Sequence, residues 1–247
     1  MHYQASNHGM FPPVIKNIII INVLMLLAKM IFAMRGINLD QVLGLFYFQS
    51  SQFNVWQIIT HVFMHGDVMH LAFNMIGLWF FGRRLEIIWG PQRFLFFYLV
   101  TALGAAFLHF LVIHIQISQI LPLLDLSLVE EINRDGYTTL MNNMNWNGNG
   151  GKYNLLANIP TVGASGAIFG ILGANLILFP NSIVQLLFPP ISLKLKYIVT
   201  FYGLYELYRG IANHPGDNVA HFAHLGGLIV GIIIVKYWNK TRRDSFF

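Results

Sequence analysis

Ser165 and His224 have the side chains that could form an activated nucleophile in this chain. Ser165 lies in GASGAIFGILGA, residues 163–174, where one hydroxyl stands among small and apolar residues. His224 lies in AHFAHLGGLIVG, residues 220–231. A neutral imidazole can take a serine proton near pH 7, so a Ser–His pair is the smallest arrangement for acyl transfer. This chemistry requires a fold that brings the two side chains together.

His70 and Asn74 are suited to stabilising an oxyanion. They lie in HLAFN at positions i and i+4, which places them on one face of a helix. Together with the backbone N–H of Ser165 at a helix N-terminus, they could donate hydrogen bonds to a tetrahedral intermediate. No aspartate is evident as a third member, and a Ser–His dyad needs none in principle.

The glycines that follow the serine and the histidine predict how their helices pack. Gly166 and Gly170 form one GxxxG pattern, and Gly227 and Gly231 form another. Such patterns let helix backbones approach closely in lipid. Packing through these two faces would bring the serine hydroxyl near the histidine ring.

The composition indicates the kind of fold that must position these residues. Of 247 residues, 55% are hydrophobic and 10% are charged, and the mean hydropathy is +0.57. These values are far from those of a soluble domain. We expect one all-α domain over residues 1–247, a polytopic bundle of six transmembrane helices in a lipid bilayer. The expected spans are residues 14–34, 67–83, 93–115, 163–188, 196–212 and 219–238.

The charged residues and the absence of cysteine exclude several classes of function. The formal net charge is +5, but the basic residues lie beside apolar segments rather than on a face of their own, so no nucleic-acid partner is expected. Without cysteine there is no disulfide, thiolate nucleophile or cysteine metal site. We expect no metal and no other cofactor.

Lysine and arginine predict the orientation of the spans. If the N-terminus is cytoplasmic, ten of the 15 basic residues fall on the cytoplasmic side and four on the other, with Lys29 inside the first span. The positive-inside rule therefore places both termini in the cytoplasm. We expect an integral multi-pass protein of the plasma (inner) membrane, in which spans two, four and six start at the outer side.

Two connections are long. Residues 36–66 are rich in apolar and aromatic side chains, which predicts a segment lying in the membrane interface. Residues 116–160 contain NRDGYTTLMNNMNWNGNGGKYN, and this Asn- and Gly-rich composition predicts an exposed, mobile outer loop.

HLAFN in span two, GASG at the start of span four and AHLGGLIVG in span six resemble motifs of the rhomboid family of intramembrane serine proteases. The resemblance extends from about residue 50 onward, and three motifs in order are far more specific than one. The stretches WQIITHVFMH and FGRRLEIIWGPQRF also resemble the family pattern.

The resemblance implies that Ser165 is the nucleophile, His224 the general base, and His70 and Asn74 oxyanion donors with the Ser165 backbone. It implies hydrolysis of peptide bonds in or near the membrane segments of single-span client proteins, with lateral access past span five. The supporting residues are Gly163, Gly166, Phe169, Gly227 and Gly231.

Two residues depart from the family pattern. Gln57 follows Trp56 where many members have arginine, which leaves a contact of that arginine in question. Phe169 stands where many members have a tyrosine against the catalytic histidine, so the ring is kept and the hydroxyl lost. Neither change removes a group that performs the chemistry.

Three other functions are compatible with parts of the sequence. His61 and His65 have the i, i+4 spacing of a metalloprotease, but Val62 replaces the glutamate of HExxH. Polar residues within spans also occur in transporters, although no repeat of one half in the other is visible. An inactive rhomboid relative that binds membrane clients is the third.

Several other polar residues are expected to be structural. Glu86 is expected to tie its loop to a neighbouring segment. The remaining histidines are taken as structural too: His61, His65, His109, His114, His214 and His221.

Overall fold

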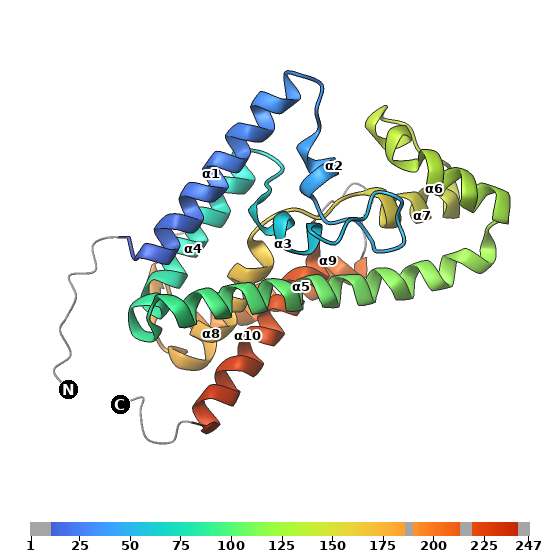
Figure 1. The fold of residues 1–247 in the computed structure, drawn as a ribbon. Helices are drawn as coiled ribbons and strands as arrows, with labels where there is room; N and C mark the ends of the chain where they lie inside the picture. The colour runs from blue at the N-terminus through green and yellow to red at the C-terminus, as the bar shows by residue number, and fades with distance from the viewer. Residues whose placement is uncertain (1–10, 186–189, 213–218, 242–247) are drawn as a thin grey trace.

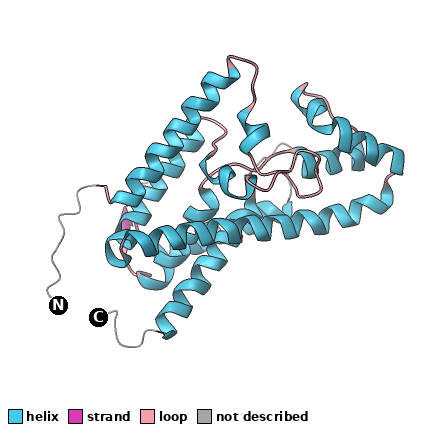
Figure 2. Cartoon of the chain, viewed as in Figure 1, coloured by secondary structure: helices cyan, strands magenta, loops and turns pink. Residues whose placement is uncertain are grey.

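The computed structural model describes residues 11–185, 190–212 and 219–241 of the chain. In these residues it is helical apart from one two-stranded antiparallel hairpin, which confirms the predicted all-α fold (Figures 1 and 2). The elements are α1 (Pro13–Ala33), α2 (Leu39–Leu43), α3 (Gln57–Thr60), η1 (His61–Phe63), α4 (Val68–Trp89), α5 (Pro91–Ile120), η2 (Leu121–Leu123), α6 (Leu126–Met141), α7 (Gly148–Asn158), α8 (Ser165–Leu178), β1 (Ile183–Gln185), β2 (Ser192–Lys194), α9 (Leu195–Ala212) and α10 (His221–Thr241).

Each expected span overlaps one helix, in the order α1, α4, α5, α8, α9 and α10. Among the described residues, three stretches are long and apolar enough to cross a bilayer: α1, α5 continued by η2, and α10. α9 carries Lys196, Glu206 and Arg209 within its 18 residues. An ionisable group inside a membrane bundle is costly without a partner. We therefore expect Glu206 to contact a polar or charged side chain.

α8 is shorter than the expected span over residues 163–188. It ends at Leu178 after 14 residues, and the chain then turns into the β1–β2 hairpin. Pro180 explains the end, because proline lacks an N–H and disfavours the helical conformation in the residue before it, Phe179. At 1.5 Å per residue α8 is about 21 Å long, shorter than the ~30 Å hydrocarbon core. At least one end of α8 must therefore lie inside the membrane.

α8 lies at the centre of the bundle (Figure 1). Every residue from Gly166 to Asn175 is buried, as expected of a helix that is apolar on all sides. α10 packs closely along it: a Cβ at Gly227 would collide with the carbonyl oxygen of Gly166, and a Cβ at Gly231 with that of Gly170. The two GxxxG faces therefore meet, as predicted.

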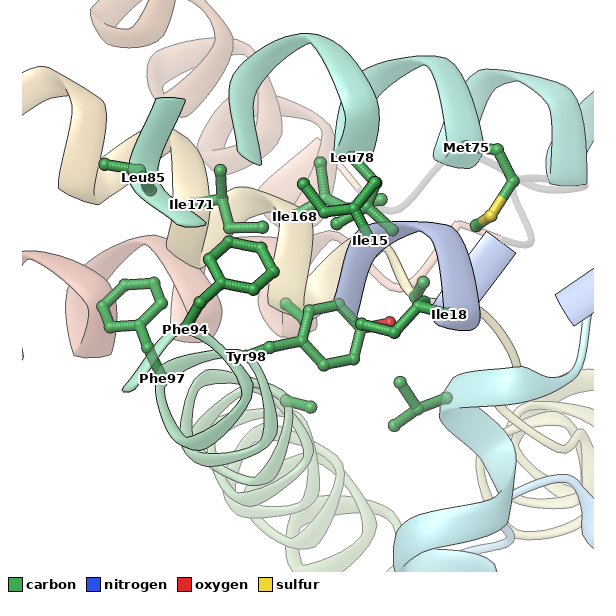
Figure 3. Packing of buried hydrophobic residues seen from close by; sticks show 14 of the residues in the cluster. Ile15, Ile18, Met75, Leu78, Leu85, Phe94, Phe97, Tyr98, Ile168 and Ile171 are labelled. Carbon is green, nitrogen blue, oxygen red and sulfur yellow. The ribbon is translucent and has the colours of Figure 1, made fainter. Parts of the chain in front are cut away.

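Large apolar side chains hold α1, α4 and α5 against α8 (Figure 3). Phe94 and Tyr98 of α5 belong to this cluster with Ile15 of α1, Leu78 of α4 and Ile171 of α8, and all five are 0% exposed. Between helices in lipid, close van der Waals packing supplies the attraction. The shapes of these side chains therefore fix the position of α8.

Glu86 joins α4 to α1. It is the expected structural tie, but it lies within α4 rather than in a loop after the second span. Its side chain is buried, and its two oxygens accept the backbone N–H groups of Val14 at 2.8 Å and Ile15 at 2.9 Å. The first N–H groups of a helix have no partner within it, and a carboxylate at that end also complements the helix dipole. Glu86 thus supplies the acceptors that the start of α1 lacks.

Gln57 organises the segment 36–66, which contains α2, α3 and η1. It is fully buried; its Oε1 accepts the backbone N–H of Asn54 at 3.1 Å, and its Nε2 donates to the carbonyl oxygen of Gln52 at 2.9 Å. An arginine could not accept the first of these bonds, because a guanidinium only donates. The glutamine is therefore a specific part of this loop.

Residues 116–160 do not form the exposed loop that their composition predicts. α5 continues into them, and α6 and α7 form a helical pair at the far end of α5 (Figure 1). Buried amides join the pair: Asn158 Nδ2 donates to the carbonyl oxygen of Ile132 at 3.3 Å, and Asn154 Nδ2 to that of Gly136 at 3.3 Å. A Cβ at Gly136 would collide with both amides. Asparagine and glycine are packing residues here, which composition alone does not reveal.

The outward faces of the helices expose many large apolar side chains. Soluble monomers rarely expose large contiguous apolar surfaces, whereas a lipid-facing surface requires them. The chain is an integral membrane protein. The exposed residues include Leu24, Ile31, Ile76, Phe107, Phe201 and Ile233.

Candidate active site

The N-termini of α8 and α10 bring Ser165 and His224 into contact. Ser165 is the first residue of α8, and His224 lies in the first turn of α10. The Oγ atom of Ser165 lies 2.7 Å from Nε2 of His224, and both residues are partly buried. This distance suits a hydrogen bond in which the hydroxyl donates to an unprotonated ring nitrogen.

The segment before α8 is fixed by the loop that precedes α4. Leu45 and Thr161 exchange two backbone hydrogen bonds of 2.9 and 2.8 Å, and the N–H of Gly163 donates to the carbonyl oxygen of His61 at 3.0 Å. Gly163 has a backbone φ of +125°, a conformation that residues with a Cβ rarely adopt. A Cβ there would also lie 2.9 Å from Nε2 of His70. Glycine at this position thus lets the His70 ring approach the start of α8.

The surroundings of His70 determine which ring nitrogen carries its proton. The backbone N–H of Gly66 donates to Nδ1 of His70 at 3.3 Å. A nitrogen that accepts a hydrogen bond is unprotonated, so in the neutral ring Nε2 carries the hydrogen. Nε2 is the nitrogen nearest Gly163. His70 therefore presents a hydrogen-bond donor toward the N-terminus of α8.

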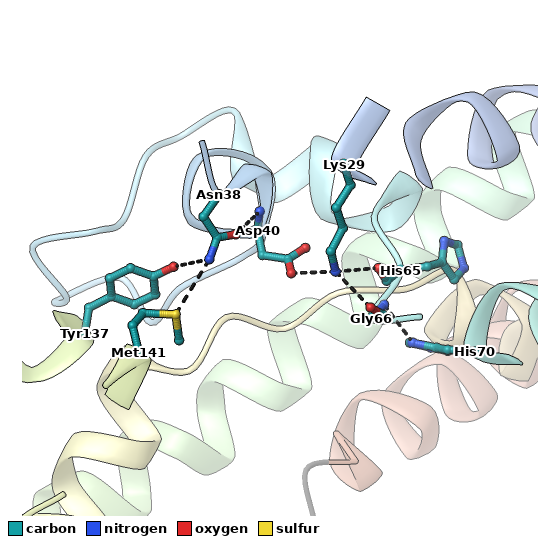
Figure 4. Close-up of polar contacts among 8 residues, drawn as sticks. All are labelled: Lys29, Asn38, Asp40, His65, Gly66, His70, Tyr137 and Met141. Carbon is teal, nitrogen blue, oxygen red and sulfur yellow. Dashed lines mark hydrogen bonds and ion pairs between the residues drawn. The ribbon is translucent and has the colours of Figure 1, made fainter. Parts of the chain in front are cut away.

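Lys29 ties this region to α1 (Figure 4). Its ammonium donates to the carbonyl oxygens of His65 and Gly66, at 2.9 Å each, and lies 2.6 Å from Oδ2 of Asp40. The charge that the sequence places inside the first span is thus matched by a carboxylate and two carbonyl groups. Since Gly66 also donates to His70, Lys29 holds the loop that sets the orientation of that ring.

Replacing Lys29 with methionine is expected to destabilise the protein by about 2 kcal/mol, because it leaves a partly buried carboxylate and two carbonyl groups without their donor. Thermal unfolding in detergent measures the change, and Lys29→Arg, which keeps the charge, should lose less. An unfolding midpoint of Lys29→Met equal to that of the wild type would show that the ion pair contributes nothing.

Asn74 lies one turn after His70 and is buried. Its Nδ2 donates to the carbonyl oxygen of His70 at 3.0 Å, within the same helix. An amide nitrogen carries two hydrogens, so one N–H remains after this bond. Asn74 and His70 line the same cavity as Ser165 and His224. The structure therefore gathers all four of these residues, although neither His70 nor Asn74 bonds to the serine.

Phe169 packs on the ring of His224. The two rings are stacked, with centroids 4.3 Å apart and an angle of 4° between their planes. Phe169 lies one turn after Ser165 on α8, so serine and phenylalanine hold the histidine from the same helix. Stacking restrains the imidazole without a hydrogen bond, which is consistent with the absence of a tyrosine hydroxyl at this position.

An acidic side chain that the sequence analysis did not assign to the site lies beside His224. Oε2 of Glu206, on α9, is 3.0 Å from Nδ1 of His224 and 2.6 Å from Nδ1 of His221. The site thus contains a carboxylate, contrary to the expectation of a dyad without an acidic neighbour. A signal was present in the sequence: an ionisable residue in an expected span, and two histidines at i and i+3 on one helix face.

A cavity of about 1670 Å³ contains the site. Its lining is largely apolar, and it extends from Ser165 toward α7 on one side and toward α4 and α9 on the other. A chain segment entering the cavity would reach the serine hydroxyl between these helices. The cavity is larger than the ~300–1,000 Å³ that is typical of small-molecule sites.

Two other histidines, His61 and His65, precede α4. Burial disfavours the charged imidazole and lowers the pKa of each to about 4, so both rings are neutral at neutral pH. Nδ1 of His61 donates to the carbonyl oxygen of Gln57 at 2.8 Å. In the described part of the chain, no group of three or more His, Asp or Glu residues is placed to hold a metal ion.

Of the remaining histidines, His109 and His114 make local contacts. Nε2 of His109 lies 2.9 Å from Oγ1 of Thr161, and Nδ1 of His114 lies 2.7 Å from the hydroxyl of Tyr47. Both contacts join α5 to neighbouring loops. His214 lies outside the described residues.

Comparison with known proteins gives relatives that are named as rhomboid proteins. The chain is 28% identical over 192 residues to RHOMBOID-like protein 12, mitochondrial, of Arabidopsis thaliana, covering 76% of this chain and 47% of that protein. It is 26% identical over 191 residues to Rhomboid protease GluP of Bacillus subtilis (strain 168), covering 77% and 27%. It is 24% identical over 194 residues to Rhomboid-like protease 3 of Toxoplasma gondii, covering 78% and 56%.

The chain thus spans between about a quarter and just over half of the length of these relatives. The Rhomboid domain model matches residues 52–240, which is well over half of the chain and includes α4, α8 and α10. These helices carry the motifs and the Ser165–His224 contact. The chain therefore belongs to the rhomboid family.

Proposed function

We propose that the chain is an intramembrane serine endopeptidase that uses Ser165 as nucleophile and His224 as general base. The 2.7 Å contact between Oγ and Nε2 carries this proposal, because it joins two residues 59 positions apart in sequence, on different helices, through the atoms that must exchange a proton. Relatives named as rhomboid proteases support the same reaction class.

In the proposed reaction, Nε2 of His224 takes the hydroxyl proton as Oγ bonds to the carbonyl carbon of the substrate. The resulting oxyanion accepts hydrogen bonds from the Ser165 N–H, from Nε2 of His70 and from Asn74. Collapse breaks the C–N bond, and the leaving amine takes the proton from His224. Water then hydrolyses the acyl-enzyme with the same histidine as base.

The proposed substrates are single-span membrane proteins. A membrane helix hides its peptide bonds in its own hydrogen bonds, so it must unwind before the serine can attack. Small or helix-breaking residues near the cleaved bond are therefore favoured. The extension of the cavity toward α4 and α9 supports lateral access from the lipid.

The positions of the basic residues support a topology with both termini in the cytoplasm and the site opening toward the outer side. The polar N-terminal ends of α4, α8 and α10 would then face the outer side, from which water reaches the acyl-enzyme. We place the chain in the plasma (inner) membrane. Tagging each terminus and testing its accessibility to protease in sealed vesicles examines this topology.

The function is tested by incubating the purified full chain in detergent with a panel of single-span substrates. We expect cleavage in or near the membrane segment, labelling of the protein by a fluorescent fluorophosphonate, and no effect of a chelator. Cleavage that a chelator abolishes would instead indicate the metalloprotease. If substrates bind but neither cleavage fragments nor labelling appear, the chain is an inactive, client-binding rhomboid protein. Solute flux that persists in Ser165→Ala would indicate a transporter.

Asn74→Ala is expected to lower kcat about 100-fold with little change in KM, as for the loss of one oxyanion donor. The hydrogen bond that this substitution removes, from Asn74 to the carbonyl oxygen of His70, lies within one helix, so the fold should persist. Steady-state kinetics and thermal unfolding separate these effects. A variant that loses stability but keeps kcat would assign Asn74 a structural role only.

A further inference from the structure

The surroundings of Glu206 differ from those of an ordinary buried acid. Its side chain is 8% exposed, and the same oxygen contacts Nδ1 of His221 at 2.6 Å and Nδ1 of His224 at 3.0 Å. The two histidines are three residues apart on α10, and Glu206 comes from α9. One carboxylate therefore joins α9 to the face of α10 that holds the proposed base.

The hydrogen-bond roles around His224 are mutually consistent. An ionised carboxylate only accepts hydrogen bonds, so a ring nitrogen that faces it carries the hydrogen. With the hydrogen on Nδ1, the Nε2 of neutral His224 has a free lone pair, and Nε2 is the atom 2.7 Å from the Ser165 hydroxyl. Glu206 therefore favours the one neutral form of His224 that can accept the serine proton.

The 3.0 Å contact between Oε2 of Glu206 and Nδ1 of His224 is within ion-pair distance but is not aligned as a hydrogen bond. Without that bond, Nδ1 of His224 is a buried donor that has no acceptor. His221 holds the same oxygen more closely. Contacts of this kind commonly become aligned only when substrate is bound. A small rotation of either side chain would satisfy Nδ1.

We propose that Glu206 is a positioning residue that completes a serine–histidine–glutamate triad, with His221 holding the carboxylate in place. This inference rests on the proposed protease function. As Oγ of Ser165 bonds to the substrate carbonyl carbon, its proton moves to Nε2 of His224. The positive charge that forms on the ring is stabilised by Glu206, while the proton on Nδ1 stays on the histidine.

In the part of the chain that the structure describes, four titratable side chains face His224 from the surrounding helices. His70 on α4 and His109 on α5 lie within electrostatic range of it, and Glu206 on α9 contacts both His224 and His221. Glu206 is the only acid among these four. Its removal is therefore the change that should alter protonation of the base most.

The test measures cleavage kinetics of the full chain in detergent as a function of pH. Glu206→Gln keeps the shape and removes the charge; we expect kcat to fall about 100-fold, less than the ~10⁴-fold loss for the buried aspartate of a serine protease triad. The acid limb of the kcat/KM profile should move to lower pH, because the imidazolium loses its counter-charge. Glu206→Asp should recover part of both.

Two matched variants separate positioning from packing. His221→Gln can still donate an N–H to Glu206, so it should lose less activity than Glu206→Gln and keep the acid limb in place. Glu86→Gln neutralises another buried glutamate, far from the site, and should lower thermal stability without moving the acid limb.

Unchanged kcat and an unmoved acid limb in Glu206→Gln would overturn the triad. Equal losses in Glu206→Gln and His221→Gln, with no movement of the acid limb, would also overturn it and leave only a tie between α9 and α10. If Glu206→Gln does not fold, the kcat/KM profile of Glu206→Asp is measured instead. A partial shift of its acid limb to lower pH would support the triad, and an unmoved acid limb would overturn it. An inactive wild type would defeat the protease function itself, whereas an active wild type beside a fully active Glu206→Gln defeats only the triad.

Discussion

Ser165→Ala and His224→Ala are each expected to reduce cleavage by at least about 10⁴-fold, because nucleophile and base act as one unit. The double variant should be no less active than either single variant, since removal of one member already disables the pair. Initial rates on a single-span substrate measure these losses. Labelling by a fluorophosphonate should disappear in Ser165→Ala and become much slower in His224→Ala.

The serine result requires a control for folding and for other hydroxyls. Ser165→Ala removes one oxygen atom and should keep the unfolding midpoint of the wild type. Ser118, whose Oγ donates to the carbonyl oxygen of His114 at 2.7 Å, lies on the exposed part of α5, and Ser118→Ala should retain cleavage and labelling. Full cleavage by Ser165→Ala would refute the proposed mechanism.

Gly227→Ala is expected to cost about 3 kcal/mol of stability, because its added methyl group would overlap the carbonyl oxygen of Gly166. This oxygen belongs to the backbone of a buried helix, so α8 and α10 must move apart to relieve the overlap. Gly166 follows Ser165, and Gly227 is three residues after His224, so the movement opens the Ser165–His224 contact. Activity should fall about 100-fold, as for a misplacement of about 1 Å.

The matched control is Gly77→Ala on α4. A Cβ there would lie 3.4 Å from Cγ2 of Ile168, an ordinary contact with a side chain of α8. The change in unfolding free energy should therefore be less than about 1 kcal/mol. Thermal unfolding of both variants tests the contrast. Equal stability of Gly227→Ala and Gly77→Ala would mean that the close approach of α8 and α10 does not support the fold.

Much of the fold follows from local chemistry. The apolar stretches predict α1, α5 and α10 to within a few residues, because a helix is the only local structure that satisfies its own backbone in lipid. The end of α8 at Leu178 was missed, although Pro180 marks it. The pair α6 and α7 was also missed, because its asparagines look like loop residues until their amides find carbonyl partners across the pair.

The sequence by itself identifies Ser165, His224, His70 and Asn74 as candidate site residues, and the structure places all four around one cavity. They can be predicted because motif order and GxxxG spacing are local properties, and small residues predict close helix contact. Only the tertiary structure placed Glu206 against His224 and Lys29 against the loop that orients His70. Such pairings depend on helix rotation and on side-chain reach, which the packing of all the helices decides and no single stretch of sequence encodes.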